Sequence, residues 1–241
     1  MACSAVPQRV VVNDRLPALV AALDARPGPK SFSVYARVES YTDRAVRKGK
    51  ILLLGRAPAS LLLRALSFTD DPLTTFRTDG VEFSYWDRQG GTCLRGDLCP
   101  RNLQRFLPLP PQTLLALFSG GWPLPEHCRS TATLWREGDQ LLLTCPYPDG
   151  RALQKVWLDE GTLLPSRMSG LDANGKRWSV ELGQWKGDEG QAPHPQRIRS
   201  RSSGGELLME IRQYQADPQL TEDAFVPACP DGIQPTAMEC E

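Results

Sequence analysis

The segment LTTFRTDGVEFSYW, residues 73–86, contains the clearest signal for the fold of this chain. Two alternating runs, Leu73–Thr78 and Val81–Trp86, flank the dipeptide Asp79-Gly80. Asp-Gly is favoured in two-residue hairpin turns, because both central residues of such a turn have positive φ. We therefore predict an antiparallel β-hairpin, with successive side chains pointing to opposite faces.

Similar runs occur on both sides of this hairpin. They cover residues 34–39, 48–54, 61–68, 92–95, 131–136, 140–145, 152–159, 166–172, 177–185, 196–201 and 207–214. Alternation of apolar and polar residues with a period of two is typical of half-buried strands. Turn signals such as Glu137-Gly138 and Asn174-Gly175 separate neighbouring runs, so we predict antiparallel pairing throughout.

Three segments have a helical pattern instead. Residues 13–25 form an apolar stripe with Pro17 in the first turn. Residues 101–106 predict a short helix, and Pro110-Pro111 opens another that ends before Gly120-Gly121. Helices this few cannot cover both faces of a wide sheet.

The strand number determines the expected shape. We predict about eleven strands, and strongly twisted open sheets rarely exceed ~10 strands without curling. A curled sheet has a concave face, which the apolar helices would cover. The sequence therefore predicts a mainly β, single domain over residues 1–241: a strongly curved antiparallel half-barrel with a helical lid.

Seven cysteines form one isolated residue, Cys3, and three close couples. The couples are Cys93 with Cys99, Cys128 with Cys145, and Cys229 with Cys240. So regular a set is typical of disulfides in an oxidising compartment. We predict pairing within each couple, because short loops cost the least entropy to close. The last bond would tie down a proline-rich tail, residues 218–241.

The cysteines and histidines do not predict a metal site. No couple has the CxxC spacing, and the only histidines are His127 and His194. A tetrahedral zinc site needs four converging ligands. We interpret Cys128, beside His127, as a structural disulfide cysteine, and we expect neither metal nor cofactor.

Charge and motifs argue against nucleic-acid binding and catalysis. Lys plus Arg and Asp plus Glu both number 28, so no net field attracts nucleic acid. The sequence contains no GxSxG, HExxH, P-loop or dinucleotide-binding motif. The adjacent carboxylates Asp70-Asp71 and Asp159-Glu160 point apart on a strand or turn, so they do not share a substrate. We predict a protein that is not an enzyme.

The N-terminal residues Ala2-Cys3-Ser4 resemble the cleavage point of a bacterial lipoprotein signal, where the cysteine becomes acylated. No apolar run approaches the ~20 residues needed to span a bilayer. We therefore expect a lipid anchor at Cys3, with residues 1–12 as a flexible tether. The alternative is an ordinary cysteine near a disordered terminus.

Short motifs in a fixed order resemble a known family. They are Lys48-Gly49-Lys50, Arg56-Ala57-Pro58, Pro72-Leu73, Thr78-Asp79-Gly80, the helix from Leu114 to Gly121, Val156–Asp159, Leu164–Arg167 and Asp223–Phe225. Their order is similar to that of the lipoprotein-localisation (LolA/LolB-like) superfamily. Two features depart from it. The loop 68–73, apolar at its tip in the acceptor of that family, here reads Thr69-Asp70-Asp71-Pro72 and has an acidic tip; the three cysteine couples are not general to the family.

The resemblance implies a periplasm-facing lipoprotein, anchored to the outer membrane, that binds lipid or lipoprotein acyl chains in lipid or lipoprotein transport or outer-membrane biogenesis. Burial of hydrocarbon is worth ~0.8 kcal/mol per CH₂ and needs no catalytic group. The expected lining residues of the cavity and lid are Val34, Ala36, Val38, Ile51, Leu53, Leu61, Leu63, Val81, Phe83, Tyr85, Leu114, Leu117 and Phe118.

Two alternatives remain open from the sequence. Each of these apolar residues could simply pack against the others as an ordinary core. The protein could also be a non-enzymatic interaction module that presents an edge strand or its lid to another envelope protein.

Overall fold

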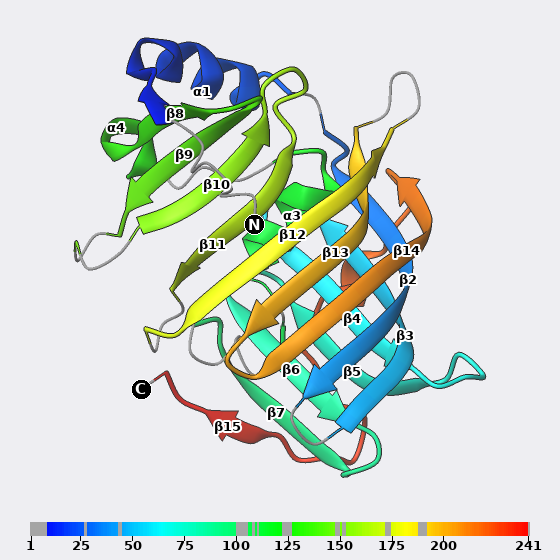
Figure 1. The fold of residues 1–241 in the computed structure, drawn as a ribbon. Coiled ribbons are helices and arrows are strands. Elements are labelled where there is room, and N and C mark those ends of the chain that lie inside the picture. The colour runs from blue at the N-terminus through cyan, green and yellow to red at the C-terminus, as the bar shows by residue number, and fades with distance from the viewer. Residues whose placement is uncertain are drawn as a thin grey trace.

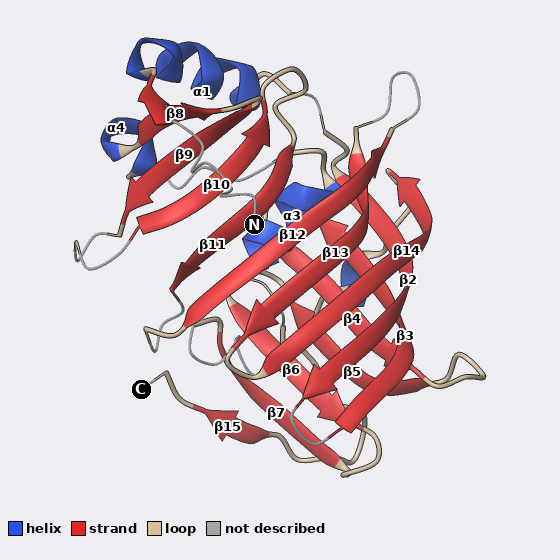
Figure 2. Cartoon of the chain, viewed as in Figure 1, coloured by secondary structure: helices blue, strands red, loops and turns tan. Residues whose placement is uncertain are grey.

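The computed structural model describes residues 9–26, 28–42, 45–99, 106–107, 109, 111–121, 127–147, 150, 153–171, 175–187 and 192–240. All strands in these residues belong to one 15-stranded sheet, in the order β1-β8-β9-β10-β11-β12-β13-β14-β2-β3-β4-β5-β6-β7-β15 (Figure 1). The sheet is strongly curved and does not close. Helix α3 lies inside the curve (Figure 2).

The elements are as follows. The strands are β1 (Arg9–Val11), β2 (Ser31–Thr42), β3 (Ala45–Arg56), β4 (Ser60–Leu66), β5 (Pro72–Thr78), β6 (Glu82–Asp87), β7 (Thr92–Asp97), β8 (Thr133–Glu137), β9 (Gln140–Pro146), β10 (Leu153–Asp159), β11 (Pro165–Leu171), β12 (Arg177–Lys186), β13 (His194–Ser202), β14 (Gly205–Ala216) and β15 (Thr236–Met238). The helices are α1 (Leu16–Asp24), α3 (Pro111–Phe118) and α4 (Cys128–Thr131), with 3₁₀ turns at Asn13–Arg15 and Glu222–Ala224.

The mainly β, curved architecture agrees with the sequence, but the sheet has 15 strands rather than about eleven. The two strands that no alternating run covers, β1 and β15, are the edges of the sheet. Each has only three residues, which is too short for alternation to be recognised. Residues 9–11 of the predicted tether therefore pair with β8, and part of the predicted tail pairs with β7.

The helices follow the predicted order. The segment 13–25 begins as a 3₁₀ turn and becomes α1 at Leu16, with Pro17 in its first turn. The Asn13 side chain accepts a hydrogen bond from the Leu134 N–H of β8 at 2.8 Å, so it ties the helix to the sheet. Residues 101–105 of the second predicted helix, and Cys3, lie outside the described residues.

The hairpin at residues 73–86 is confirmed, with a longer turn than predicted. Thr78 pairs with Phe83, so four residues rather than two form the connection. The Asp79 carboxylate accepts the N–H groups of Val81 and Glu82, which holds these residues in the loop. Val81 is therefore 72% exposed, and its expected place in the cavity lining is wrong.

All six paired cysteines form disulfides, but only one bond joins a predicted couple. Cys128–Cys145 is confirmed, with 5.4 Å between its Cα atoms. The other two bonds are Cys93–Cys229 and Cys99–Cys240, so pairing within those two couples is wrong. The physical reason is that β15 runs parallel to β7. This pairing brings together cysteines that are separated in the sequence by 136 positions in one bond and 141 in the other.

These bonds fix the segment 218–235, the C-terminal strap, on the convex side of the sheet. Phe83 and Tyr85 face the concave side, so Trp86 faces outward, and Cys93 pairs with Trp86 in register. Phe225 of the strap is 1% exposed, with the Arg56 guanidinium 4.8 Å from its ring centroid. The strap therefore crosses the outer face from the end of β3 to β7.

The interleaved bonds Cys93–Cys229 and Cys99–Cys240 predict a non-additive loss of stability. With one bond intact, the other closes only a short ring made of residues 93–99 and 229–240. Replacing either pair by alanine is expected to lower the unfolding free energy by about 3 kcal/mol, and the last bond, which closes a long loop, contributes roughly 5 kcal/mol. Urea unfolding of the two double variants and the quadruple variant measures this.

The Cys128→Ala/Cys145→Ala variant is the control, because its short loop shares no residue with the ring of residues 93–99 and 229–240 and its effect should add to the others. Mass spectrometry of unreduced peptides checks the pairing itself. A peptide that links Cys93 with Cys99 would contradict it.

Candidate functional site

The concave face of the sheet and helix α3 form one apolar cluster. Twelve of the thirteen expected lining residues belong to it or pack against it; Val81 does not. Those at most 6% exposed are Val34, Ala36, Ile51, Leu53, Leu61, Phe83, Leu114, Leu117 and Phe118, and those partly buried are Val38, Leu63 and Tyr85. In this structure α3 is seated directly on the sheet, so these side chains cover one another.

Four aromatic and aliphatic residues of the site were missed by the sequence analysis. The ring of Phe32 lies 5.3 Å from that of Phe118, and Phe76 stacks on Phe83 at 5.8 Å. Phe106 lies 4.4 Å from Tyr85, and Leu115 is 6% exposed in the same cluster. Extending the alternation of residues 34–39 backward would have found Phe32. Phe106 ends the predicted helix 101–106, but that pattern did not indicate which surface its side chain contacts.

Gly55 sets how closely α3 approaches the sheet. It lies on β3 directly opposite Phe32 of β2 and Leu61 of β4. A Cβ atom at this position would clash with the Phe32 ring and lie 2.8 Å from Cδ2 of Leu115. Because Gly55 has no side chain, the Leu115 side chain of α3 can pack directly against β3.

The carboxyl end of α3 is held by two polar contacts, which we call the α3 latch. The Tyr214 hydroxyl donates a hydrogen bond to the Phe118 carbonyl at 2.6 Å. Arg26 donates from Nη1 to the Gly120 carbonyl at 3.2 Å and from Nη2 to the Thr162 carbonyl at 2.6 Å. Burial raises the pKa of Tyr214 to about 12, so the hydroxyl stays a donor over the physiological range.

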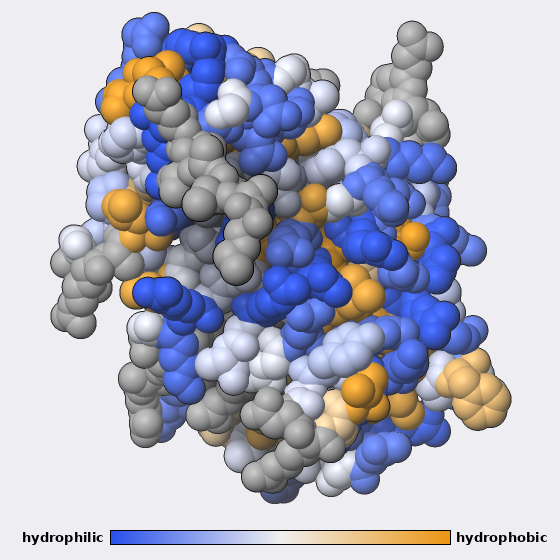
Figure 3. Space-filling model, in the orientation of Figure 1, coloured by the Kyte–Doolittle hydropathy of each residue, from blue (hydrophilic) through white to orange (hydrophobic). Residues whose placement is uncertain are grey.

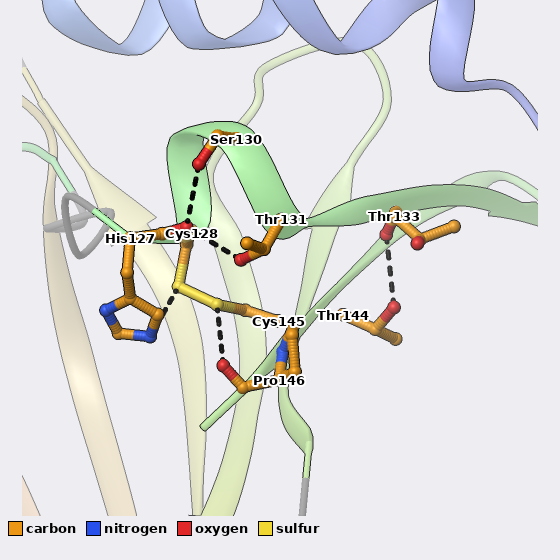
Figure 4. The surroundings of a disulfide bond; sticks show 8 residues. All are labelled: His127, Cys128, Ser130, Thr131, Thr133, Thr144, Cys145 and Pro146. Carbon is orange, nitrogen blue, oxygen red and sulfur yellow. Dashed lines mark hydrogen bonds between the residues drawn. A yellow bond between two sulfur atoms is a disulfide. The ribbon is translucent and has the colours of Figure 1, made fainter. Parts of the chain in front are cut away.

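A second cluster, at α4, has the residue types of a metal site. Ligand atoms of His127, Cys128 and Cys145 lie within 4.8 Å of one another. Figure 4 shows that the two sulfur atoms are bonded to each other, with His127 Nε2 3.5 Å from the Cys128 sulfur. Disulfide sulfurs are not thiolate ligands, and three donors do not complete a tetrahedral zinc site. This geometry fits a structural disulfide.

The convex side contains an open groove of about 830 Å³ at β2, β3 and the β4–β5 loop. Its cations are paired: Lys48 contacts Glu39 at 3.0 Å, and Lys50 contacts Asp70 at 3.0 Å. The hydrogen bond from Lys50 holds the pKa of Asp70 below its usual range. Phe68, beside this pair, is 87% exposed. The tip of the loop therefore carries an exposed aromatic side chain beside two acids, of which Asp70 is paired with Lys50 and Asp71 accepts a hydrogen bond from the Thr69 hydroxyl.

Within the part of the chain that the structure describes, no helix has the length and apolar character required to traverse a bilayer.

The latch predicts a local change in the Tyr214→Phe variant. Loss of the hydrogen bond to Phe118 is worth about 1 kcal/mol, so amide hydrogen exchange in residues 111–118 should accelerate roughly fivefold. Tyr35→Phe, which changes a hydroxyl on the convex face, is the control. Equal exchange in both variants would contradict the latch.

The same residue predicts a pH dependence. The pKa of Tyr214 is 10.0 as a free side chain and about 12 in the folded protein. Between these values the unfolded chain ionises while the folded one does not, so stability falls as pH rises through this window. The loss of unfolding free energy between pH 8 and pH 11, measured with urea, should be smaller in Tyr214→Phe than in the wild type.

Comparison with known proteins shows which solved structures share this fold. No protein-family model matches the sequence, and no curated protein matches it. Among solved structures, the chain is similar to a LolA superfamily protein from Nitrosomonas europaea, with 14% identity, a TM-score of 0.57 and coverage of 90% of this chain and 98% of that chain.

Two further structures are similar over most of their length. One is a DUF1329 family protein from Desulfovibrio piger, with 11% identity, a TM-score of 0.64 and coverage of 88% of this chain and 96% of that chain. The other is a putative outer membrane lipoprotein-sorting protein domain from Vibrio parahaemolyticus, with 12% identity, a TM-score of 0.55 and coverage of 87% and 95%. The resemblance predicted from the sequence motifs is confirmed for the architecture: the protein has the fold of LolA superfamily proteins.

Proposed function

We propose that this protein binds the acyl chains of lipids or lipoproteins between its curved sheet and α3, and acts in lipid or lipoprotein transport or outer-membrane biogenesis. In this proposal the protein faces the periplasm and is anchored to the outer membrane by a lipid on Cys3. The observation that carries the proposal is the apolar helix α3 held inside an unclosed sheet, in a fold shared with lipoprotein-sorting proteins.

The free energies of helix displacement and lipid burial are comparable. Re-exposing four large apolar side chains of α3 costs about 6 to 12 kcal/mol, and burying a chain of ~16 carbons returns about 12 kcal/mol. The four side chains are Leu114, Leu115, Leu117 and Phe118. Acyl chains can therefore replace the helix on the sheet at little net cost. The hydrogen bonds of the α3 latch would also have to break when the helix is displaced.

The exposed Phe68 supports contact with a lipid surface. An aromatic side chain that is 87% exposed on a loop is available for the membrane interface, where one apolar face can be buried. Of the two acids in this loop, Asp70 is paired with Lys50 and Asp71 accepts a hydrogen bond from the Thr69 hydroxyl. We therefore include delivery or collection of lipid at a membrane surface in the proposal.

Lipid binding is tested by mass spectrometry of protein purified from membranes and by titration with a fluorescent fatty acid. We expect bound lipid, saturable uptake into the apolar site, and uptake several times faster in Tyr214→Phe, because that variant loosens α3. The control is again Tyr35→Phe. Absence of bound lipid together with absence of fatty-acid uptake would sink the proposal.

The membrane part is tested separately with Phe68→Glu. We expect transfer of lipid between the protein and vesicles to fall severalfold, while uptake of monomeric fatty acid stays unchanged, because Phe68 is far outside the concave cluster. Val46→Glu, a change at another exposed apolar residue, is the control. Unchanged vesicle transfer would remove the loop from the proposal.

A second candidate function is binding of an envelope protein at the sheet edge. β1 is an edge strand, and its Val10 and Val11 are 53% and 49% exposed. A partner strand could pair with such an edge. Val10→Lys would abolish partner capture in that case and leave fatty-acid uptake intact, whereas the acyl-chain proposal predicts no effect of this change.

A further inference from the structure

Two half-buried arginines on the convex face have no acidic partner. Arg64 of β4 and Arg77 of β5 both have a buried Nε atom, and neither forms a hydrogen bond or ion pair within the described ranges. The Trp86 Nε1–H of β6 is likewise buried and unbonded there. Arg95, on the same face, is by contrast paired with Glu82 at 2.6 Å.

The strand register brings these donors into one patch. Leu62, Arg77, Ser84 and Arg95 form one row across β4 to β7, and Arg64, Thr75, Trp86 and Cys93 form the next. Arg64 and Arg77 are therefore diagonal neighbours on the same face, within reach of each other. We call Arg64, Thr75, Arg77, Ser84 and Trp86 the convex donor cluster. It combines two guanidinium groups, an indole N–H and two hydroxyls.

The charges of the cluster are uncompensated. Burial lowers the pKa of Arg77, and the neighbouring charge of Arg64 lowers it further. A guanidinium group is charged at neutral pH, so the cluster carries two positive charges. Two like charges, partly removed from water and adjacent, are unfavourable unless an anion lies near them.

Residues 225–229 of the C-terminal strap pass beside the cluster without supplying that anion. They span from Phe225, at Arg56, to Cys229, which is bonded to Cys93 in the same row as Arg64 and Trp86. Phe225 and Pro227 are buried, and the segment Phe225-Val226-Pro227-Ala228-Cys229 contains no carboxylate. The strap therefore excludes water, which strengthens any ionic contact beneath it.

We propose that the convex donor cluster binds a phosphate group, either as inorganic phosphate or as the phosphate of a lipid headgroup. Guanidinium groups bind phosphate oxygens through paired N–H donors. A tetrahedral phosphate presents oxygens in several directions, which suits donors that come from three neighbouring strands. A carboxylate has two oxygens in one plane and would leave more of these donors unbonded. This site is separate from the concave cluster and does not depend on acyl-chain binding there.

The first experiment compares thermal unfolding in phosphate and in chloride at equal ionic strength. Wild-type protein should be stabilised by phosphate in a saturable way. Arg64→Gln and Arg77→Gln should each weaken the apparent affinity about tenfold, and the double variant should lose the response. Arg95→Gln removes a cation of the same row that is already paired, so it should keep the response.

A second experiment uses the wild-type protein and so does not depend on the folding of a variant. The Trp86 indole N–H resonance, assigned with Trp86→Phe, should shift on addition of inorganic phosphate. A shift with short-chain phosphatidylglycerol that phosphate reverses would identify the headgroup as the source; a shift with phosphate alone would identify the free ion. An unshifted Trp86 resonance with both probes, or an undiminished phosphate response in Arg64→Gln/Arg77→Gln, would overturn the proposal.

Discussion

The packing of α3 against the concave face is the interaction on which the rest of this structure depends. A sheet of 15 strands must curl, and its inner apolar face needs a cover. One eight-residue helix supplies much of that cover, with Leu114, Leu117 and Phe118 almost completely buried. Gly55 makes the close approach possible, because no side chain stands between β3 and the helix.

The two faces of the sheet have different chemistry. The concave face is apolar, and helix α3, which lies inside the curve of the sheet (Figure 1), packs on it. The convex face carries arginines, hydroxyls and ion pairs, and Figure 3 shows polar residues over much of the visible surface with small apolar areas between them. The strap crosses this convex face, where Cys93–Cys229 and Cys99–Cys240 hold it.

The errors of the sequence analysis share a cause. Val81 was expected in the cavity because Asp-Gly indicates a two-residue turn, but the Asp79 carboxylate and the Thr78 hydroxyl together stabilise a longer loop. Cys93 and Cys99 were expected to pair because they are close in sequence, but β15 lies beside β7 and offers nearer partners. In both cases a contact between residues of the folded chain outweighed the local rule.

Local patterns were sufficient for whatever depends on neighbours in sequence. Alternation predicted most strands, the proline and glycine positions predicted α3, and short ordered motifs predicted the fold that the solved structures confirm. The tertiary structure alone decided the edge strands, the long-range disulfides, the exposure of Phe68 and the isolation of Arg64 and Arg77. The reason is that a periodic pattern shows which face a side chain takes, whereas its partners on that face come from strands and straps far away in the chain.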